Sequence, residues 1–337
     1  MRYLTSLLLM ALLALPLTSQ EGKEKEKQGK LDPETKKVVD KGLEWLAKQQ
    51  GADGSWGDSR YPHNTAVTGF ALLAMMSNGN VPNQGKYGSE VAKATRFLIA
   101  SSREGDGYLV GSRGGNMYCH GMATLALSQL FGMTADEEVK KVLKKAVDLI
   151  VRSQNYDGGW RYEPTPSGAD ISVTIMQVMA LRGAKDSGLH VPDKVMKKAL
   201  EYINSCYDPG TGGYTYQPGN RAPGFARTAA GICVLKLAGE YDKKIDRSVE
   251  FLKKSMENPR EHFWYGHYYA CHAFHQVGGK DWEDYYGMIT KKFPAAQSAD
   301  GSWSKGNDGG AAGPVYQTSI AIIALSVPTH YLPIFQR

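Results

Sequence analysis

Asp170 is the residue of this sequence whose type and position point most directly to chemistry. It stands in the stretch Asp170-Ile171-Ser172-Val173, just before an apolar segment with few charges. A carboxyl group at the start of a buried helix can act as a general acid, and it can also cap the helix by accepting hydrogen bonds from backbone N–H groups. Capping is the simpler interpretation, and acid catalysis is the alternative that makes Asp170 a candidate catalytic residue.

Polar side chains also stand at the starts of the other apolar segments. If these segments are helices that begin at one mouth of a ring, the side chains at their starts converge there. Pockets of this kind combine apolar walls with a few polar groups. We take His120 as a second catalytic candidate beside Asp170. The candidates for substrate binding are Tyr118, Arg227, His267, Tyr268, Tyr269 and Tyr316.

A metal site is a further interpretation of the segment that contains His267. His267, Cys271 and His275 have the i, i+4, i+8 spacing of one helical face, and imidazole and thiolate are zinc ligands. Eight residues of helix rise about 12 Å, however, which is too far for three ligands of one ion. A two-ligand zinc half-site completed by His120 stays open as an alternative. We expect these residues to pack in the core, and we expect no metal and no cofactor.

A repeated unit fills most of the chain and must position the candidate residues. Each unit has an amphipathic segment, then a turn with an aromatic residue, in most units beside glycine, and then an apolar segment. The six turn aromatics follow one another at intervals of 52, 52, 54, 50 and 39 residues, and they are Trp56, Tyr108, Trp160, Tyr214, Trp264 and Trp303. Six copies of one helix pair follow from this spacing.

The two segments of each unit predict helices of different kinds. The first carries apolar residues at i, i+3, i+4 and i+7, as at Leu143, Ala146, Val147 and Ile150, which is typical of a helix with one buried face. The second is apolar nearly all round, as in residues 65–76, which is typical of a helix buried on all sides. No segment alternates with the period of a strand. We therefore predict an all-α fold, an α/α toroid (α6/α6 barrel) of six helix pairs.

The turn motifs support this fold through a resemblance. Three of them contain glutamine, Asp-Gly or Asp-Gly-Gly, and tryptophan, in residues 49–56, 154–160 and 297–303. They resemble the QW repeat of squalene–hopene cyclases, and the unit is similar to the repeat of protein prenyltransferase β subunits. The chain also looks like exported bacterial proteins that carry such repeats. The resemblance covers about residues 32–332.

The resemblance also implies a chemistry. In squalene–hopene cyclases an aspartate of a DxDD motif donates the proton that starts cyclisation, and the stretch that begins at Asp170 keeps only the first of these carboxylates. Prenyltransferases imply zinc held by Asp, Cys and His, but Cys119 follows Met117 and Tyr118, so no Asp-x-Cys pair is present there. Whether the protein is an enzyme stays open at this point.

The N-terminus predicts export. Arg2 precedes an apolar run from Leu4 to Leu17, and this order is typical of a secretory signal. We expect a signal peptide in residues 1–20, a flexible tether in 21–31 and a single toroid domain in 32–337. The protein is then periplasmic or extracellular, and it can associate with a membrane surface.

Composition and charge limit the choice of partner. The 40 Lys and Arg residues exceed the 34 Asp and Glu residues only slightly, whereas nucleic-acid binding needs basic residues concentrated on one face. We expect a monomer that binds an apolar or isoprenoid small molecule and no nucleic acid. Three functions remain: a terpenoid-cyclase-like enzyme with Asp170 as its acid, an exported protein that binds a lipid or other ligand without catalysis, and a polysaccharide lyase or hydrolase in which Arg227 holds an acidic sugar.

Overall fold

The structure is a computed structural model that describes residues 29–58, 60–111, 114–220, 222–305 and 313–336. The predicted signal peptide (1–20) and most of the predicted tether (21–31) lie outside the described residues. Within the described residues the regular elements are all helical, and the pairing of extended backbone is limited to isolated bridges. None of the described helices has the length and apolar character needed to cross a bilayer.

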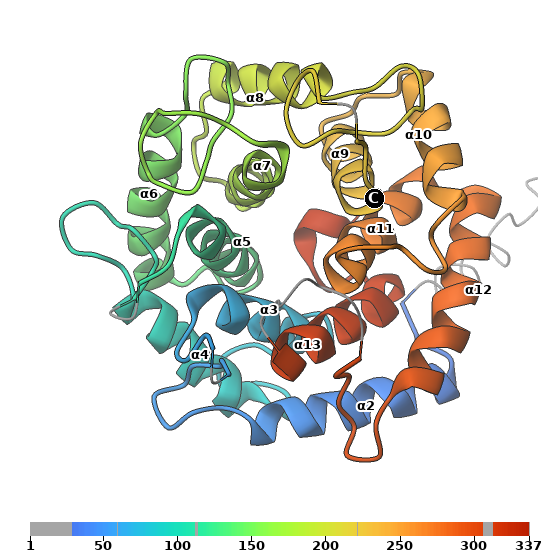
Figure 1. Cartoon of the computed structure of the whole chain (residues 1–337). Coiled ribbons are helices and arrows are strands. Elements are labelled where there is room, and N and C mark those ends of the chain that lie inside the picture. The colour runs from blue at the N-terminus through green and yellow to red at the C-terminus, as the bar shows by residue number, and fades with distance from the viewer. Residues whose placement is uncertain (1–28, 59, 112–113, 221, 306–312, 337) are drawn as a thin grey trace, which may run out of the picture.

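Twelve helices form two concentric rings, which Figure 1 shows along the ring axis. The outer ring contains α2 (Pro33–Lys48), α4 (Gly88–Ala100), α6 (Glu137–Arg152), α8 (Asp193–Ser205), α10 (Lys244–Lys253) and α12 (Gly279–Ala296). The inner ring contains α3 (Thr65–Met76), α5 (Met117–Thr134), α7 (Ile171–Asp186), α9 (Phe225–Leu237), α11 (Phe263–Val277) and α13 (Gly313–Ser326). The prediction of an α/α toroid with six helix pairs is confirmed.

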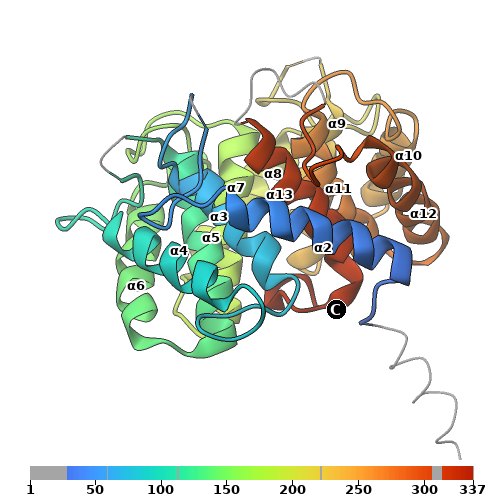
Figure 2. The same ribbon diagram turned by 90° about the horizontal axis from the view of Figure 1, so that it is seen from below.

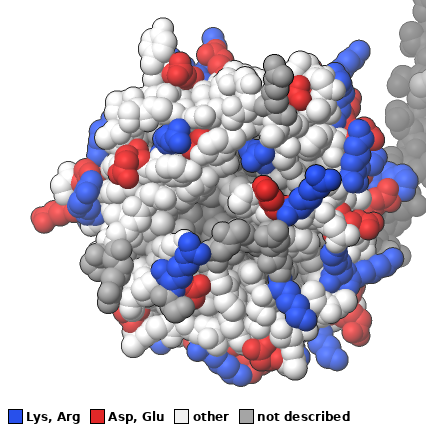
Figure 3. Space-filling model, in the orientation of Figure 1, with Lys and Arg blue, Asp and Glu red and all other residues white. Residues whose placement is uncertain are grey.

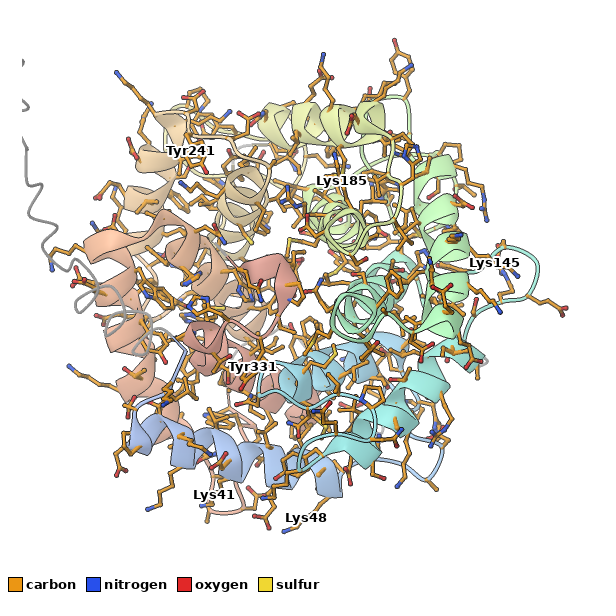
Figure 4. All side chains as sticks on the ribbon, turned by 180° about the vertical axis from the view of Figure 1, so that it is seen from behind. Lys41, Lys48, Lys145, Lys185, Tyr241 and Tyr331 are labelled. Carbon is orange, nitrogen blue, oxygen red and sulfur yellow. The ribbon has the colours of Figure 1, made fainter. Side chains whose placement is uncertain are left out.

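Burial follows the two patterns seen in the sequence. In α6 the buried side chains include Val139, Leu143 and Ile150, which lie on one face, while Lys145 of this helix and Lys41 and Lys48 of α2 lie at the outer edge of the molecule (Figure 4). In α3 all residues but one are buried. Because an inner helix is surrounded by protein, the side chains along it are buried, including polar ones such as Gln177 of α7.

Glutamine side chains tie consecutive outer helices together. The amide Nε2 of Gln50 donates to the carbonyl of Gly54 in its own turn at 3.0 Å and to that of Glu90 in α4 at 2.9 Å. Gln154 makes the equivalent pair of bonds to Gly158 and to Val195 of α8. Gln297 bonds to Gly301 and to Val38 of α2, both at 3.0 Å. Since α2 is the first outer helix and Gln297 follows the last one, this bond closes the ring.

The turn tryptophans are structural, as their place beside the glutamine predicts. The indole Nε1 of Trp56, Trp160 and Trp303 donates at 2.8 Å to a carbonyl near the end of the preceding outer helix. The backbone N–H of each tryptophan donates to a threonine hydroxyl in the following inner helix, and these threonines are Thr68, Thr174 and Thr318. Each turn is therefore fixed to both helices of its unit.

The fifth unit differs from the expectation. The sequence placed Phe263 and Trp264 in a turn, but both belong to the first turn of α11. The Trp264 indole donates to the carbonyl of Lys305 in the next unit, and not to its own outer helix. The shorter interval between Trp264 and Trp303 reflects this shift in position.

The two faces of the ring are not equivalent. The inner helices begin on the face turned to the viewer in Figure 1, and the C-terminus lies on the opposite side (Figure 2). There the short 3-10 helix η2 (Pro333–Phe335) packs against α5 and α7, and the Ile334 N–H donates to Oε1 of the buried Gln129 at 2.8 Å. The C-terminal segment thus covers the far ends of two inner helices and leaves the mouth on the other face.

The closing bond predicts a stability effect. Gln297→Ala removes two hydrogen bonds and should lower the free energy of unfolding by about 1–3 kcal/mol. Denaturant titration of the purified protein measures this change. Gln49→Ala is the matched control, because Gln49 is an exposed glutamine at the end of α2. If the Gln297→Ala protein is as stable as the control, the hydrogen bonds of Gln297 do not stabilise the closed ring.

Gly158 gives a second stability prediction. Its φ is +95°, and a Cβ there would lie 2.2 Å from the carbonyl oxygen of Lys198 in α8. Gly188 has a similar φ of +92°, with open space around the Cβ position. Gly188→Ala should cost about 1–2 kcal/mol for the backbone conformation alone, and Gly158→Ala should cost about 1–3 kcal/mol more because of the overlap. Equal losses of unfolding free energy in the two variants would refute a close contact between the turn and α8.

Candidate functional site

A cavity of about 500 Å³ opens where the six inner helices begin. The space-filling view shows this face hollowed near its centre (Figure 3). All six inner helices contribute to the walls, which is the convergence that the ring predicted. The lining residues are Arg60, Tyr61, Asn64, Ala66, Val67, Phe70, Asn116, Tyr118, Cys119, Met122, Tyr162, Ser172, Met176, Tyr216, Ala226, Arg227, His262, Tyr265 and Tyr316.

The lining has an apolar floor and a polar rim. Phe70, Met122 and Met176 lie a turn or more inside their helices, whereas the asparagines stand at helix starts. Asn64 and Asn116 cap α3 and α5 by accepting hydrogen bonds from backbone N–H groups. The expectation of an apolar central cavity thus holds for the floor, and the mouth is mixed in character because the lining residues at the helix starts include polar groups.

Three of the predicted binding residues, Tyr118, Arg227 and Tyr316, line the cavity. Each stands in the first turns of its inner helix, on α5, α9 and α13. Burial holds the pKa of Tyr118 well above its usual value, with a smaller contribution from the nearby Tyr265. A role for these three side chains in substrate binding stays a prediction.

Three other predicted binding residues lie behind the lining. His267, Tyr268 and Tyr269 have no exposed surface. The ring of Tyr268 meets that of Phe70 edge-on at 5.1 Å, and the ring of Tyr269 meets that of Tyr265 at 5.1 Å. The prediction placed the tyrosines too close to the mouth. They stand about one turn deeper in α11 than Tyr265, which lines the cavity. They can therefore support the cavity wall but do not form it.

His120 occupies a structural place outside the lining, and the catalytic role expected for it stays a prediction. Its Nδ1 accepts from the Leu109 N–H at 3.0 Å, and its Nε2 lies 3.1 Å from the carbonyl of Ala146 in α6. Burial lowers the pKa of His120 to about 4, so the ring is neutral near pH 7 and its Nε2 carries the proton to Ala146. His120 occupies the fourth position of α5, which is the position of Thr68 in α3. It fixes the turn as the threonines do.

Asp170 caps α7 with one carboxylate oxygen, and its other oxygen has no hydrogen-bond partner. Oδ1 accepts from the Val173 N–H at 3.0 Å, so the simpler interpretation from the sequence is confirmed. The side chain is fully buried, and Oδ2 has no hydrogen-bond partner. Burial raises the pKa of this carboxyl, and the Val173 bond opposes the shift. Asp170 interacts electrostatically with Tyr118 and Tyr216 of the lining, so the acid lies close behind the cavity wall.

The charged side chains among the described lining residues are two arginines. Arg60, Arg227 and His262 line the cavity, and no Asp or Glu is found among its described lining residues. Arg227 is held by a bond of 2.8 Å from Nη2 to the Ala222 carbonyl, and its Nε is buried without a partner. A Cβ on Gly224 would lie 2.7 Å from Nη2, so glycine at this position makes room for the guanidinium.

Sequence reasoning missed the lining residues that stand in turns. Tyr162 and Tyr216 each follow a turn aromatic, Trp160 or Tyr214, by two residues, and their hydroxyls lie 2.8 Å apart. This fixed place in the repeat was a usable signal. Arg60, Tyr61 and His262 come from less regular turns, and no repeat signal marks them.

The residues considered for zinc are engaged elsewhere. His267 Nδ1 bonds to the Tyr285 hydroxyl at 2.9 Å, and Cys271 Sγ donates to the Tyr268 carbonyl. Among the described residues no group of three or more His, Cys, Asp or Glu is arranged to hold a metal ion, so the half-site gains no support. All four cysteines lie in the described part of the chain and are buried free thiols.

Solved structures share this fold. An inactive variant of an α-1,6-mannanase from Salegentibacter sp. HEL1_6, in complex with α-1,6-mannotriose, matches with a TM-score of 0.66 at 9% identity over 90% of this chain and 100% of the mannanase. The type II terpene cyclase MstE from Scytonema, in complex with its substrate geranylgeranyl dihydroxybenzoate, matches with a TM-score of 0.61 at 12% identity over 89% of this chain and 98% of the cyclase. At these identities the likeness concerns the fold.

Sequence comparison gives the family. No curated protein matches the chain significantly. The family described as "Domain of unknown function (DUF6288)" matches residues 35–267, more than half of the chain. The protein therefore belongs to this family.

Proposed function

We propose that the protein binds, in the cavity at its mouth, a small molecule with an anionic group and an apolar or ring-shaped body. The observation that carries this proposal is the lining itself, in which two arginines, a histidine and six tyrosines face a cavity without a described carboxylate. An anion placed there gains charge-assisted hydrogen bonds and meets no like charge.

Arg227 is the side chain best placed to take the anionic group. One bond to the Ala222 carbonyl fixes its guanidinium, so little conformational entropy is lost when a ligand binds. Its Nε–H is buried and has no protein partner, and a buried unpaired donor costs free energy that an acceptor on the ligand recovers. A carboxylate or phosphate oxygen is such an acceptor.

The rest of the ligand has room on the floor. A volume of about 500 Å³ falls within the range of small-molecule sites, and Phe70, Met122 and Met176 offer an apolar contact surface. The substrate named for the terpene cyclase MstE joins an isoprenoid chain to a dihydroxybenzoate, which combines an apolar body with an acidic head. That combination matches the chemistry of this lining.

Acid catalysis on the bound ligand is a second candidate function, and Asp170 favours it. A buried carboxyl with a raised pKa and an unpartnered oxygen can hold a proton and deliver it. This would be a terpenoid-cyclase-like reaction, in which Asp170 acts alone where the DxDD motif has further carboxylates. The resemblance of the turns to QW repeats supports the same reading.

A hydrolase is equally compatible with the fold but less so with the cavity. Glycoside hydrolysis uses two carboxyl groups on either side of the bond that is cut, and the described lining offers none. A polysaccharide lyase or another protein that holds an acidic sugar would still use Arg227 as an anion site. Export, inferred from the apolar run at Leu4–Leu17, would place the ligand in the periplasm or outside the cell.

The anion site predicts a preference between matched ligands. Geranylgeranoic acid and geranylgeraniol share their apolar chain, and glucuronate and glucose share most of their ring. The acid of at least one pair should bind at least about tenfold more tightly than its neutral partner, because a charged hydrogen bond contributes about 1.5–3 kcal/mol. Calorimetric titration measures both affinities.

Arg227→Ala should remove this preference, while Arg96→Ala should leave it unchanged because Arg96 is exposed on the outer helix α4. Equal affinity for acid and neutral partner in both pairs, or no binding of any of the four, would speak against the proposal. Mass spectrometry of molecules that co-purify with the protein extends the test to other ligands.

The buried state of Asp170 predicts a pH dependence of stability. Its pKa is raised in the folded protein above the usual 3.8, so folding favours the protonated form. The wild type should therefore lose unfolding free energy as the pH rises from about 3.8 through the raised pKa. Asp170→Asn removes this loss and should gain stability relative to the wild type over that interval.

Denaturant titrations at several pH values check this trend. Asp136→Asn is the control, because Asp136 caps α6 in an exposed position. If the wild-type and Asp170→Asn curves run parallel with pH, burial does not perturb Asp170.

A further inference from the structure

Two tyrosines connect the region of Asp170 with the cavity. The hydroxyls of Tyr162 and Tyr216 form a hydrogen bond of 2.8 Å, and both side chains line the cavity. The two residues come from the turns of neighbouring units. Tyr162 is exposed at the mouth, with 38% of its surface accessible, and Tyr216 is more buried. The pair therefore runs from the rim toward the wall.

Backbone bonds fix both tyrosines at the starts of inner helices. The Met117 N–H donates to the Tyr162 carbonyl at 2.9 Å, and the Ile171 N–H donates to the Tyr216 carbonyl at 3.0 Å. The Gln217 amide also donates to the carbonyl of Ala169, next to Asp170, at 2.8 Å. The segment that carries Tyr216 is thus attached on both sides of Asp170 in sequence.

At the inner end, Asp170 offers the free oxygen. Its Oδ1 is engaged by the helix, whereas Oδ2 is buried and unpartnered. The Tyr216 hydroxyl is near enough to lower the pKa of this carboxyl, although burial outweighs that effect. A small movement of the tyrosine completes a hydrogen bond to Oδ2. An unpaired buried oxygen favours that movement, because leaving it unpaired costs free energy.

Other titratable and charged groups also surround Asp170. The titratable and charged side chains that interact with it electrostatically are Tyr216, Arg161, Tyr118, Tyr265, Tyr202 and Cys206. Arg161 lowers the pKa of Asp170. Burial raises the pKa of Tyr118, Tyr265, Tyr202 and Cys206, so these four stay protonated near pH 7.

We propose that Asp170 exchanges its proton with the cavity through Tyr216 and Tyr162. In the outward direction the Oδ2–H bond breaks as a new O–H bond forms on Tyr216, Tyr216 passes its own proton to Tyr162, and Tyr162 gives its proton to an oxygen of the ligand. Asp170 is left as a carboxylate and the ligand oxygen gains one proton. The reverse sequence restores the acid from water at the mouth.

The consequence for function rests on the proposed ligand site. Tyr162 is then the residue that touches the ligand, and Asp170 and Tyr216 act through it. The ligand class is narrowed to molecules with a hydroxyl, carboxyl or ether oxygen beside Tyr162. Arg227 takes the anionic group, and the proton path serves a second oxygen. Acid–base chemistry at that oxygen needs no further carboxyl group in the lining.

The test follows the proton in the ligand-free protein, so its outcome is separate from that of the ligand titrations. The protein is labelled with ¹³C at the aspartate carboxyl and the tyrosine Cζ, and its spectra are recorded between pH 3 and pH 9. Asp170→Asn identifies the Asp170 signal, and Tyr162→Phe identifies the Tyr162 signal. In the wild type the Tyr162 signal should shift over the same pH interval as the Asp170 signal.

Variants complete the test. Tyr216→Phe should move the Asp170 titration to higher pH, because it removes a donor to the carboxylate, and it should abolish the pH response of Tyr162. Tyr156→Phe is the control, since Tyr156 is 90% exposed, and it should change neither signal. The proposed proton exchange through Tyr216 and Tyr162 is contradicted if the Tyr162 signal does not shift with the titration of Asp170 in the wild type. It is also contradicted if Tyr216→Phe behaves like the control. The wild-type measurement holds even if Tyr216→Phe fails to fold.

Discussion

The amide of one glutamine side chain, donated to two backbone carbonyls at once, is the interaction on which the ring depends. Gln50 and Gln154 each join their own turn to the next outer helix, and Gln297 joins the last turn to α2 across 259 residues of sequence. The last inner helix, α13, also packs against α2 and α3, so the ring closes through this bond and through helix packing together. Closure gives the inner helices neighbours on both sides and brings all six of their starts to one mouth.

That convergence sets the chemistry of the cavity. Polar residues in the middle of the inner helices, such as Thr124, Gln129 and Gln177, are buried, whereas the polar side chains that line the cavity stand in the first turns and in the turns just before them. Helix starts also carry the positive end of the backbone dipole. Two arginines add to it, and the described lining contains no carboxylate. The mouth of this fold is thereby suited to an anionic ligand, whereas the mannanase and the cyclase show that the same ring serves other chemistries.

The residues at the mouth divide into those that hold the ring and those that face the cavity. His120 and Thr68 stand at the same helix position and accept a backbone N–H of their turn. Tyr118 is only two residues from His120, yet it lines the cavity. Asp170 has a part in both groups, because one oxygen caps α7 and the other points to no protein partner. The capping bond favours an acid in this buried place, and the unpartnered oxygen opposes it.

The sequence by itself determined the repeat, the two kinds of helix and the region in which a site must lie, because helix periodicity and the spacing of turn motifs are local properties of the chain. It also predicted the capping role of Asp170. It could not tell which side of each first turn faces the cavity. Successive residues of a helix differ by about 100° in direction, so Tyr118 and His120 point to opposite sides, and Tyr268 lies one turn too deep. The hydroxyl contact between Tyr162 and Tyr216, from turns 54 residues apart, arises only when neighbouring units pack together, and only the tertiary structure decides it.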